Sequence, residues 1–218
     1  DLVAKGYLPQ AVLNYLLLLG WAPEGEQEIF SLDEMIKIWD PSRISKSPAI
    51  FDPLKLRAIN AAYIRALPAE EFRRLADPFI DSAVHRDIDR DLLCANLQPR
   101  CEVLEDIPPQ LDFFDAVIPY DAELYRNKKQ KTTPESAKEA LTALLPVLEG
   151  VNDWNRDAIF EACKVLAEQM EKKNGWLLYP LGIALSGKSR TPGGGTDLAA
   201  MLGKEETLAR LRTALGEV

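Results

Sequence analysis

Helix start signals recur along the whole chain and constrain its fold more than any other feature. Asp52 can cap a helix whose first residue, Pro53, needs no backbone donor there. Ser31 is followed three residues later by Glu34, the spacing of a capping box. No long run alternates apolar and polar residues as a half-buried strand does. We therefore predict an all-α fold without a significant sheet.

Two segments near the start carry the most specific patterns. Residues 6–21 read GYLPQAVLNYLLLLGW, a very apolar helix that begins at Pro9, closes at Gly20 and lets Trp21 pack back. Residues 45–64 read SKSPAIFDPLKLRAINAAYI. The apolar residues expected on the helix of this second segment are Leu54, Ile59, Tyr63 and Ile64.

The remaining chain divides into further predicted helices and soft boundaries. The helices are expected over 68–76 and 86–97, after Thr133-Pro134, from Asn155 to Asn174-Gly175, over 177–185, and after Thr196 and Lys204. We predict a connecting module over 1–67 and a larger helical region over 68–218, with subdomains of about 68–131 and 132–218.

Composition limits the class of protein. The 218 residues are 47% hydrophobic, which is typical of a globular chain. The net charge of −8 argues mildly against nonspecific nucleic-acid binding. The longest unbroken apolar run is far too short to span a bilayer, and no secretion signal opens the chain. The three cysteines have no metal-type spacing, so a reducing, cytoplasmic location is expected.

Residues 182–189, GIALSGKS, match the phosphate-loop pattern literally. That motif requires a strand before it and a helix directly after it, so that backbone amides surround the phosphates. Pro180 and the glycine-rich stretch after Arg190 fit neither requirement. We favour a short helix closed by Gly187, with Lys188 exposed in a loop, and keep a nucleotide-binding loop as the alternative.

Metal or nucleophilic chemistry has little support in the sequence. His85 is the only histidine, and one imidazole forms neither a metal cluster nor a triad. We expect it on a solvated helix face, and we predict no catalytic residue, metal or cofactor in this chain.

The segments 6–21 and 45–64 closely resemble the region that follows the catalytic domain of bacterial glutamyl-tRNA synthetases, which are class I enzymes. Residues 185–187 and 202–205 continue the resemblance more weakly. It implies a helical, tRNA-binding, C-terminal part of such an enzyme. The parent enzyme attaches glutamate to tRNA-Glu in protein biosynthesis and uses ATP and Mg.

Both ATP-binding signatures of that family are expected to lie outside this sequence. Residues 44–47, ISKS, imitate one signature, but they match a non-catalytic stretch of the family, and the other signature is absent. Whether the chain itself is an enzyme is therefore left open, and the missing catalytic domain is a predicted partner.

The resemblance assigns Arg100 to the third anticodon base. Residues 98–101 and 104–108 resemble the family stretch that carries this arginine. A guanidinium suits the role because its planar fork of donors can bind a base edge or stack on it. The alternative is an ordinary surface arginine.

The resemblance also assigns Thr191, Pro192 and Gly193 to the loop that approaches the first two anticodon bases. Gly194 and Gly195 depart from the apolar and aromatic residues usual there, and Gly182 replaces a usual arginine.

Weaker tRNA contacts are expected from two further places. Asn60 and Tyr63 match a family helix near the inner corner of the tRNA, although Tyr63 fits a core position equally well. The basic run of Arg126, Lys128, Lys129 and Lys131 is either a solvated loop or a phosphate contact.

Together these features predict a module that docks tRNA-Glu and verifies its anticodon, acting as a monomer without membrane contact. An all-α protein-interaction module that binds no tRNA is the alternative. It explains the acidic charge and the helices, but not the two matching segments.

Overall fold

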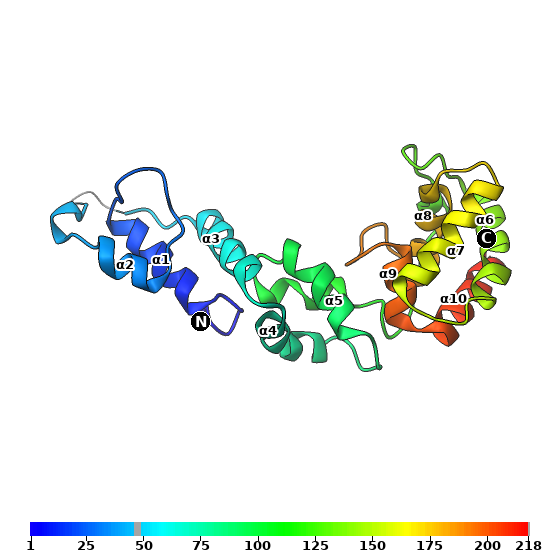
Figure 1. The fold of residues 1–218 in the computed structure, drawn as a ribbon, viewed down its shortest axis with the longest axis horizontal. Coiled ribbons are helices and arrows are strands. Elements are labelled where there is room, and N and C mark those ends of the chain that lie inside the picture. The colour runs from blue at the N-terminus through cyan, green and yellow to red at the C-terminus, as the bar shows by residue number, and fades with distance from the viewer. Residues whose placement is uncertain (46–48, 218) are drawn as a thin grey trace. The chain divides into compact units, whose positions relative to one another are not determined.

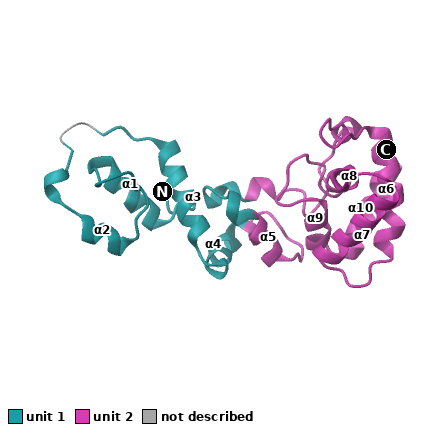
Figure 2. Ribbon diagram, turned by 45° about the horizontal axis from the view of Figure 1, so that its top comes forward, with its two compact units in different colours: residues 1–79, 97–107 teal, residues 80–96, 108–218 magenta. Residues whose placement is uncertain are grey.

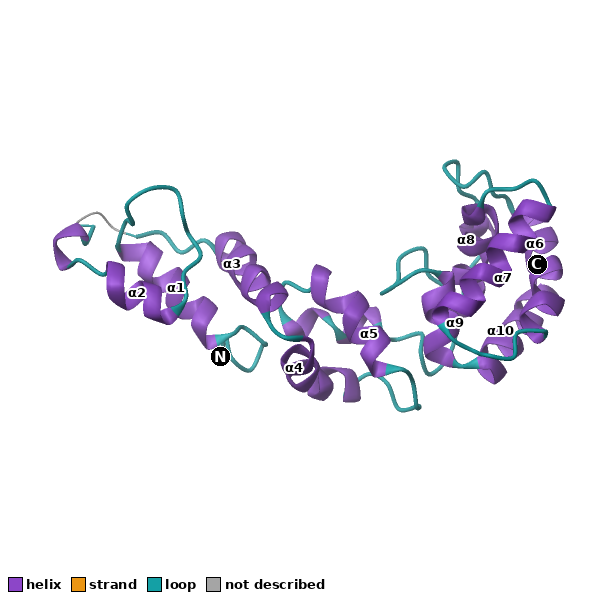
Figure 3. Ribbon diagram, in the orientation of Figure 1, coloured by secondary structure: helices purple, strands orange, loops and turns teal. Residues whose placement is uncertain are grey.

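The computed structural model describes residues 1–45 and 49–217, so Lys46, Ser47 and Pro48 of the second matching segment, and Val218, lie outside it. Within the described part the chain is helical and contains isolated bridges but no strand (Figure 3), which confirms the predicted all-α fold. Two compact units are present, one of residues 1–79 and 97–107, the other of residues 80–96 and 108–218 (Figure 2).

The first unit is built on two helices whose starts follow the sequence. α1 (Pro9–Gly20) packs against α3 (Pro53–Ala66), which is capped by the Asp52 carboxylate. α2 (Leu32–Ile38) begins with the predicted capping box. Most of α4 (Ala69–Asp81; Figure 1) also belongs to this unit. The short 3-10 turns η1 (Pro41–Arg43), η2 (Gln98–Arg100) and η3 (Leu104–Asp106) complete its elements.

The buried face of α1 differs from the apolar face that its sequence suggests. Asn14 and Tyr15 are buried, whereas Leu13 and Leu16 are 45% and 54% exposed. The Asn14 amide explains its burial, because its nitrogen donates to the Glu28 carbonyl at 2.7 Å and its oxygen accepts from the Phe30 amide at 2.8 Å. Buried polar groups need hydrogen-bond partners, and here these partners hold residues 28–30 against α1.

The second unit is a helical bundle. α8 (Asn174–Ser186) packs against α6 (Pro134–Glu149), α7 (Arg156–Gln169), α9 (Gly195–Leu202) and α10 (Lys204–Glu217). The residues of α8 are apolar on nearly every side, as a helix with several neighbours requires. α5 (Arg90–Leu97) and the 3-10 turns η4 (Pro108–Gln110) and η5 (Ala122–Tyr125) precede the bundle in sequence.

Helix starts in this unit were predicted better than helix ends. Thr133 and Asn155 cap α6 and α7 as expected. α7 was predicted to end at Asn174-Gly175, but it ends at Gln169, and Glu171 directly after the capping residue adopts a φ of 55°. Asn174 instead opens α8.

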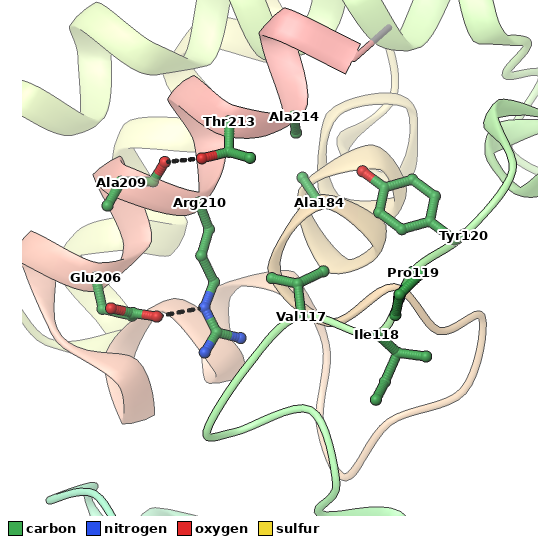
Figure 4. Close-up of a pocket in the computed structure, with 10 residues that line it drawn as sticks. All are labelled: Val117, Ile118, Pro119, Tyr120, Ala184, Glu206, Ala209, Arg210, Thr213 and Ala214. Carbon is green, nitrogen blue, oxygen red and sulfur yellow. Dashed lines mark hydrogen bonds and ion pairs between the residues drawn. The ribbon is translucent and has the colours of Figure 1, made fainter.

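Arg210 on α10 is the main buried charge of the second unit. Its guanidinium donates to the carbonyls of Phe113 at 2.8 Å, Leu185 at 2.6 Å and Phe114 at 2.6 Å. It also donates to the Glu206 carboxylate at 2.6 Å, the bond that Figure 4 shows. Glu206 also accepts from Arg86 at 2.6 Å. This bond from Arg86, with a further contribution from Arg210, lowers the pKa of the Glu206 carboxyl to about 2.

We expect Glu206→Gln to lower the free energy of unfolding at pH 7 by about 1–3 kcal/mol, because Arg210 would keep its burial and lose its counter-charge. The native pKa lies below the ordinary 4.5, so this stabilisation is complete above about pH 4.5 and disappears as the pH falls toward 2. Urea denaturation from pH 2 to pH 7 measures it.

Glu205→Gln is the matched control, because Glu205 is the exposed neighbour in the same helical turn. This explanation of the ion pair would be contradicted if Glu206→Gln unfolds with the free energy of the unaltered chain at pH 7. It would also be contradicted if the difference in free energy of unfolding stays the same down to pH 2.

Candidate nucleic-acid interface

Arg100 stands at the end of η2, in the first unit. Gln98 holds this turn in place, because its amide nitrogen donates to the carbonyls of Ile64 at 3.0 Å and Leu67 at 2.8 Å, at the end of α3. The next residue, Cys101, is buried, and burial raises the pKa of its thiol to about 12. Arg100 is exposed, and no residue in the described ranges pairs with its guanidinium. The turn therefore presents a free guanidinium on a fixed backbone.

Asn60 has a structural role in the same unit. Its side chain is fully buried, its oxygen accepts from the Leu8 amide at 2.8 Å, and its nitrogen donates to the Glu102 carbonyl at 2.6 Å. These two bonds leave no exposed atom for RNA, so the structure does not support the predicted contact by Asn60.

Tyr63, for which the sequence left a core position and an RNA contact open, is half-buried in the first unit. Its hydroxyl bonds to the Phe30 carbonyl and lies 2.9 Å from the Asn14 side-chain oxygen. Desolvation raises the pKa of the phenol. A hydroxyl engaged in this way favours packing over RNA contact.

The predicted basic run forms a closed turn in the second unit. The amides and carbonyls of Asn127 and Thr132 exchange two hydrogen bonds of 3.1 Å, and the Asn127 side chain accepts from the Lys129 amide at 3.0 Å. Arg126 is exposed but pairs with Glu123, whereas Lys128, Lys129 and Lys131 are exposed without an ion pair in the described ranges. Lys128 and Lys129 are thus available to phosphates, while Arg126 is occupied.

Residues 182–189 do not form a phosphate-binding loop. Gly182 lies inside α8, so a helix replaces the required strand. Gly187 closes that helix with a φ of 72°, and a Cβ there would lie 1.9 Å from the Ile118 carbonyl oxygen. Lys188 was expected to be exposed, but it is half-buried and forms an ion pair with Asp112. The segment therefore has neither the backbone conformation nor the free lysine that a nucleotide-binding loop requires.

The predicted 191–193 loop follows in the second unit and holds its own shape. The Thr191 hydroxyl donates to the Gly193 carbonyl at 2.9 Å, and Pro192 is buried. Gly193 has a φ of 107°, which favours glycine. The Gly194 amide donates to Asp197 at 2.7 Å. Arg100 and this loop thus belong to different units, and each is fixed by its own local bonds.

The structure gives a reason for Gly195, one of the departures from the family pattern. A Cβ at this position would lie 2.6 Å from the Leu178 carbonyl oxygen and 3.0 Å from the Gly182 nitrogen. α8 and α9 therefore meet at backbone distance, which an aromatic side chain at position 195 would prevent.

His85 is outside the described helices rather than on a helix face as expected. Its ring nitrogen Nδ1 lies 2.6 Å from an Asp115 oxygen, and its backbone amide donates to the other oxygen at 2.9 Å. This pairing is a loop contact. In the part of the chain with described coordinates, no group of histidine, cysteine and carboxylate side chains could hold a metal ion.

A cavity of about 570 Å³ lies in the second unit beside Arg210, between α8, α10 and residues 117–120 (Figure 4). Its walls include Tyr120, Ala184 and Thr213, and the Thr213 hydroxyl donates to the Ala209 carbonyl at 3.1 Å. None of the predicted tRNA-contacting residues lines it.

No helix of the described residues combines the length and apolar character of a membrane span. The described part of the chain is thus an all-α protein that presents the exposed guanidinium of Arg100 on a fixed turn. A family model described as the anticodon binding domain matches residues 61–215, and the chain belongs to this family. A second model, described as the catalytic domain of class I tRNA synthetases (E and Q), matches residues 1–58.

Curated relatives agree with this assignment. The chain is 45% identical over 218 residues to a glutamate–tRNA ligase of Clostridium botulinum, covering 100% of this chain and 45% of that protein. It is 44% identical over 216 residues to the glutamate–tRNA ligase of Clostridium acetobutylicum, covering 99% of this chain and 44% of that protein. The chain thus spans less than half the length of these relatives.

A solved glutamate–tRNA ligase from Elizabethkingia meningosepticum, in complex with its amino acid, superposes with a TM-score of 0.83 at 29% identity. The superposition covers 97% of this chain and 42% of that one. The predicted resemblance to glutamyl-tRNA synthetases is therefore confirmed, and anticodon binding is favoured over a protein-interaction module.

We expect Gly195→Ala to lower the free energy of unfolding by about 1–3 kcal/mol, because the new Cβ would force α8 and α9 apart. Gly216→Ala is the control, since a Cβ there meets nothing within 4 Å and alanine favours a helix. Chemical denaturation of both variants measures the difference. Equal stabilities would contradict the backbone contact.

Proposed function

We propose that this chain binds the anticodon arm of tRNA-Glu and verifies its third anticodon base through Arg100. The carrying observation is the free, exposed Arg100 guanidinium on a turn that Gln98 fixes to α3. Unpaired bases of an RNA loop are recognised by such planar donors, which bind base edges or stack on base faces. The family match over residues 61–215 supports this placement.

The same proposal assigns supporting contacts to the second unit. Thr191, Pro192 and Gly193 form a fixed loop for the first two anticodon bases. Lys128 and Lys129 contact phosphates, which hold the RNA in place without reading its sequence. Asn60 and Tyr63 support the fold of the first unit and make no contact with the RNA.

We propose further that the chain acts with a class I catalytic domain, which supplies the ATP and Mg site for charging tRNA in the cytoplasm. The match of residues 1–58 to the catalytic-domain model supports this. Several apolar side chains of this stretch are exposed, as expected for a surface that another domain covers. They include Leu16 at 54%, Ile50 at 86%, Phe51 at 56% and Leu54 at 76% exposed.

We expect Arg100→Gln to reduce the preference for the tRNA-Glu anticodon arm over one with guanine at the third position. The loss should be roughly 5- to 150-fold, the usual range for a base-specific arginine contact. Lys129→Ala should weaken both RNAs equally, because phosphate contacts carry no sequence information. Fluorescence anisotropy titrations of the 218-residue chain with both RNAs provide the measurement.

If Arg100→Gln weakens both RNAs equally or leaves both unchanged, Arg100 does not read this base. If the unaltered chain binds both RNAs alike, the proposed function itself is wrong.

A further inference from the structure

Nearly every arginine of the described chain is occupied by a carboxylate or a carbonyl. Arg57 pairs with Glu102 and Asp106, and Arg156 pairs with Asp157 and Asp197. In the described ranges only the guanidinium groups of Arg65, Arg100 and Arg190 have neither a hydrogen bond nor an ion pair, and all three residues are exposed. In a chain with a net charge of −8, a guanidinium without a counter-charge is an exception. Arg190 directly precedes the loop proposed to bind the anticodon.

The loop around Arg190 is fixed on both sides. On the N-terminal side, Gly187 closes α8, and the Lys188 ammonium pairs with Asp112 and donates to the Pro109 carbonyl at 3.3 Å. On the C-terminal side, the Thr191 hydroxyl closes onto the Gly193 carbonyl at 2.9 Å. Arg190 therefore extends from a backbone that does not have to be ordered when RNA binds, which reduces the entropic penalty of binding.

The residues next to Arg190 have few free side-chain groups that could contact a base. The Thr191 hydroxyl already donates its hydrogen, Pro192 is buried and Gly193 has no side chain. Nearby carboxylates are also engaged, because Asp112 holds Lys188 and Asp197 holds Arg156 and the Gly194 amide. Arg190 is thus the side chain beside this loop that offers a fork of several free donors.

We infer that Arg190 is a specificity-determining residue that contacts the edge or face of one of the first two anticodon bases. This inference rests on the proposed function, since it needs the anticodon arm to lie on the 191–193 loop. It adds a base-reading group to a loop whose own side chains are occupied by internal bonds. The guanidinium combines charge with a planar donor fork, whereas a lysine ammonium supplies charge alone.

The test compares the unaltered chain, Arg190→Lys and Arg190→Ala in anisotropy titrations with anticodon arms. The RNAs are the tRNA-Glu arm and three derivatives, each with one anticodon base replaced. We expect Arg190→Ala to reduce the preference for the tRNA-Glu base at the first or second anticodon position by roughly 5- to 150-fold. The preference at the third position should stay unchanged. Arg190→Lys should lose the same preference while keeping most of the affinity, because it keeps the charge.

Lys173→Ala is the matched control, because Lys173 is an exposed cation of the same unit that makes no capping bond to α8. It should leave every base preference unchanged. All variants should unfold at the temperature of the unaltered chain, since the altered side chains are exposed.

Two results would overturn the inference. Arg190→Ala could weaken all four RNAs by the same factor with a smaller salt dependence, which would identify a phosphate contact. It could also leave all four affinities unchanged. In either case the proposed function would still be supported if the unaltered chain prefers the tRNA-Glu anticodon bases. If the unaltered chain shows no base preference, the proposed function itself is refuted.

Discussion

The buried guanidinium of Arg210 joins three parts of the second unit that are distant in sequence. Arg210 belongs to α10, and its guanidinium donates to the Leu185 carbonyl near the end of α8 and to the carbonyls of Phe113 and Phe114. Desolvation lowers the pKa of this arginine, and Glu206 opposes that effect as its counter-charge. A buried charge of this kind destabilises the fold unless it is paired and hydrogen-bonded, so the packing of α8, α10 and residues 113–114 has to keep these partners around Arg210.

This constraint extends to the proposed interface. The last turn of α8 is fixed by Arg210 at Leu185, by the Ile118 amide at the Ser186 carbonyl, and by the tight approach of Gly187 to Ile118. The loop that carries Arg190 begins one residue later. In the first unit, the side-chain amides of Asn14, Asn60 and Gln98 act in a similar way, because each bonds backbone groups of a segment distant in sequence. Buried polar groups thus hold the turns, and the free arginines extend from them.

The sequence predicted what depends on a few adjacent residues. The caps at Ser31, Asp52, Thr133 and Asn155 were correct because a cap is a bond between residues two or three positions apart. The end of α7 was wrong because Glu171 adopts a left-handed conformation that the sequence favours at Gly175 instead. The exposure of Leu54 was also missed, since it depends on which face of α3 meets α1.

The candidate site shows the same limit. The resemblance to a known family indicated Arg100 and the 191–193 loop. The sequence could not indicate that Asn60 is buried or that Lys188 is paired, because their partners Leu8, Glu102 and Asp112 are distant in sequence. Arg190 belongs to no motif, and its availability follows from the absence of partners in the folded chain, which the sequence does not reveal. Its only signal in the sequence was its position beside Thr191. Ion pairing between distant residues therefore decides which cations are available for RNA.

We propose that free arginines on fixed turns bind the anticodon arm, while paired arginines maintain the fold. NMR spectra of the arginine Nε–Hε groups test this directly, recorded on the 218-residue chain before and after addition of the tRNA-Glu anticodon arm. The account predicts that the signals of Arg100 and Arg190 shift, while those of Arg57 and Arg210 stay in place. Shifts confined to the paired arginines, or no shift at Arg100 and Arg190 on saturation, would contradict it.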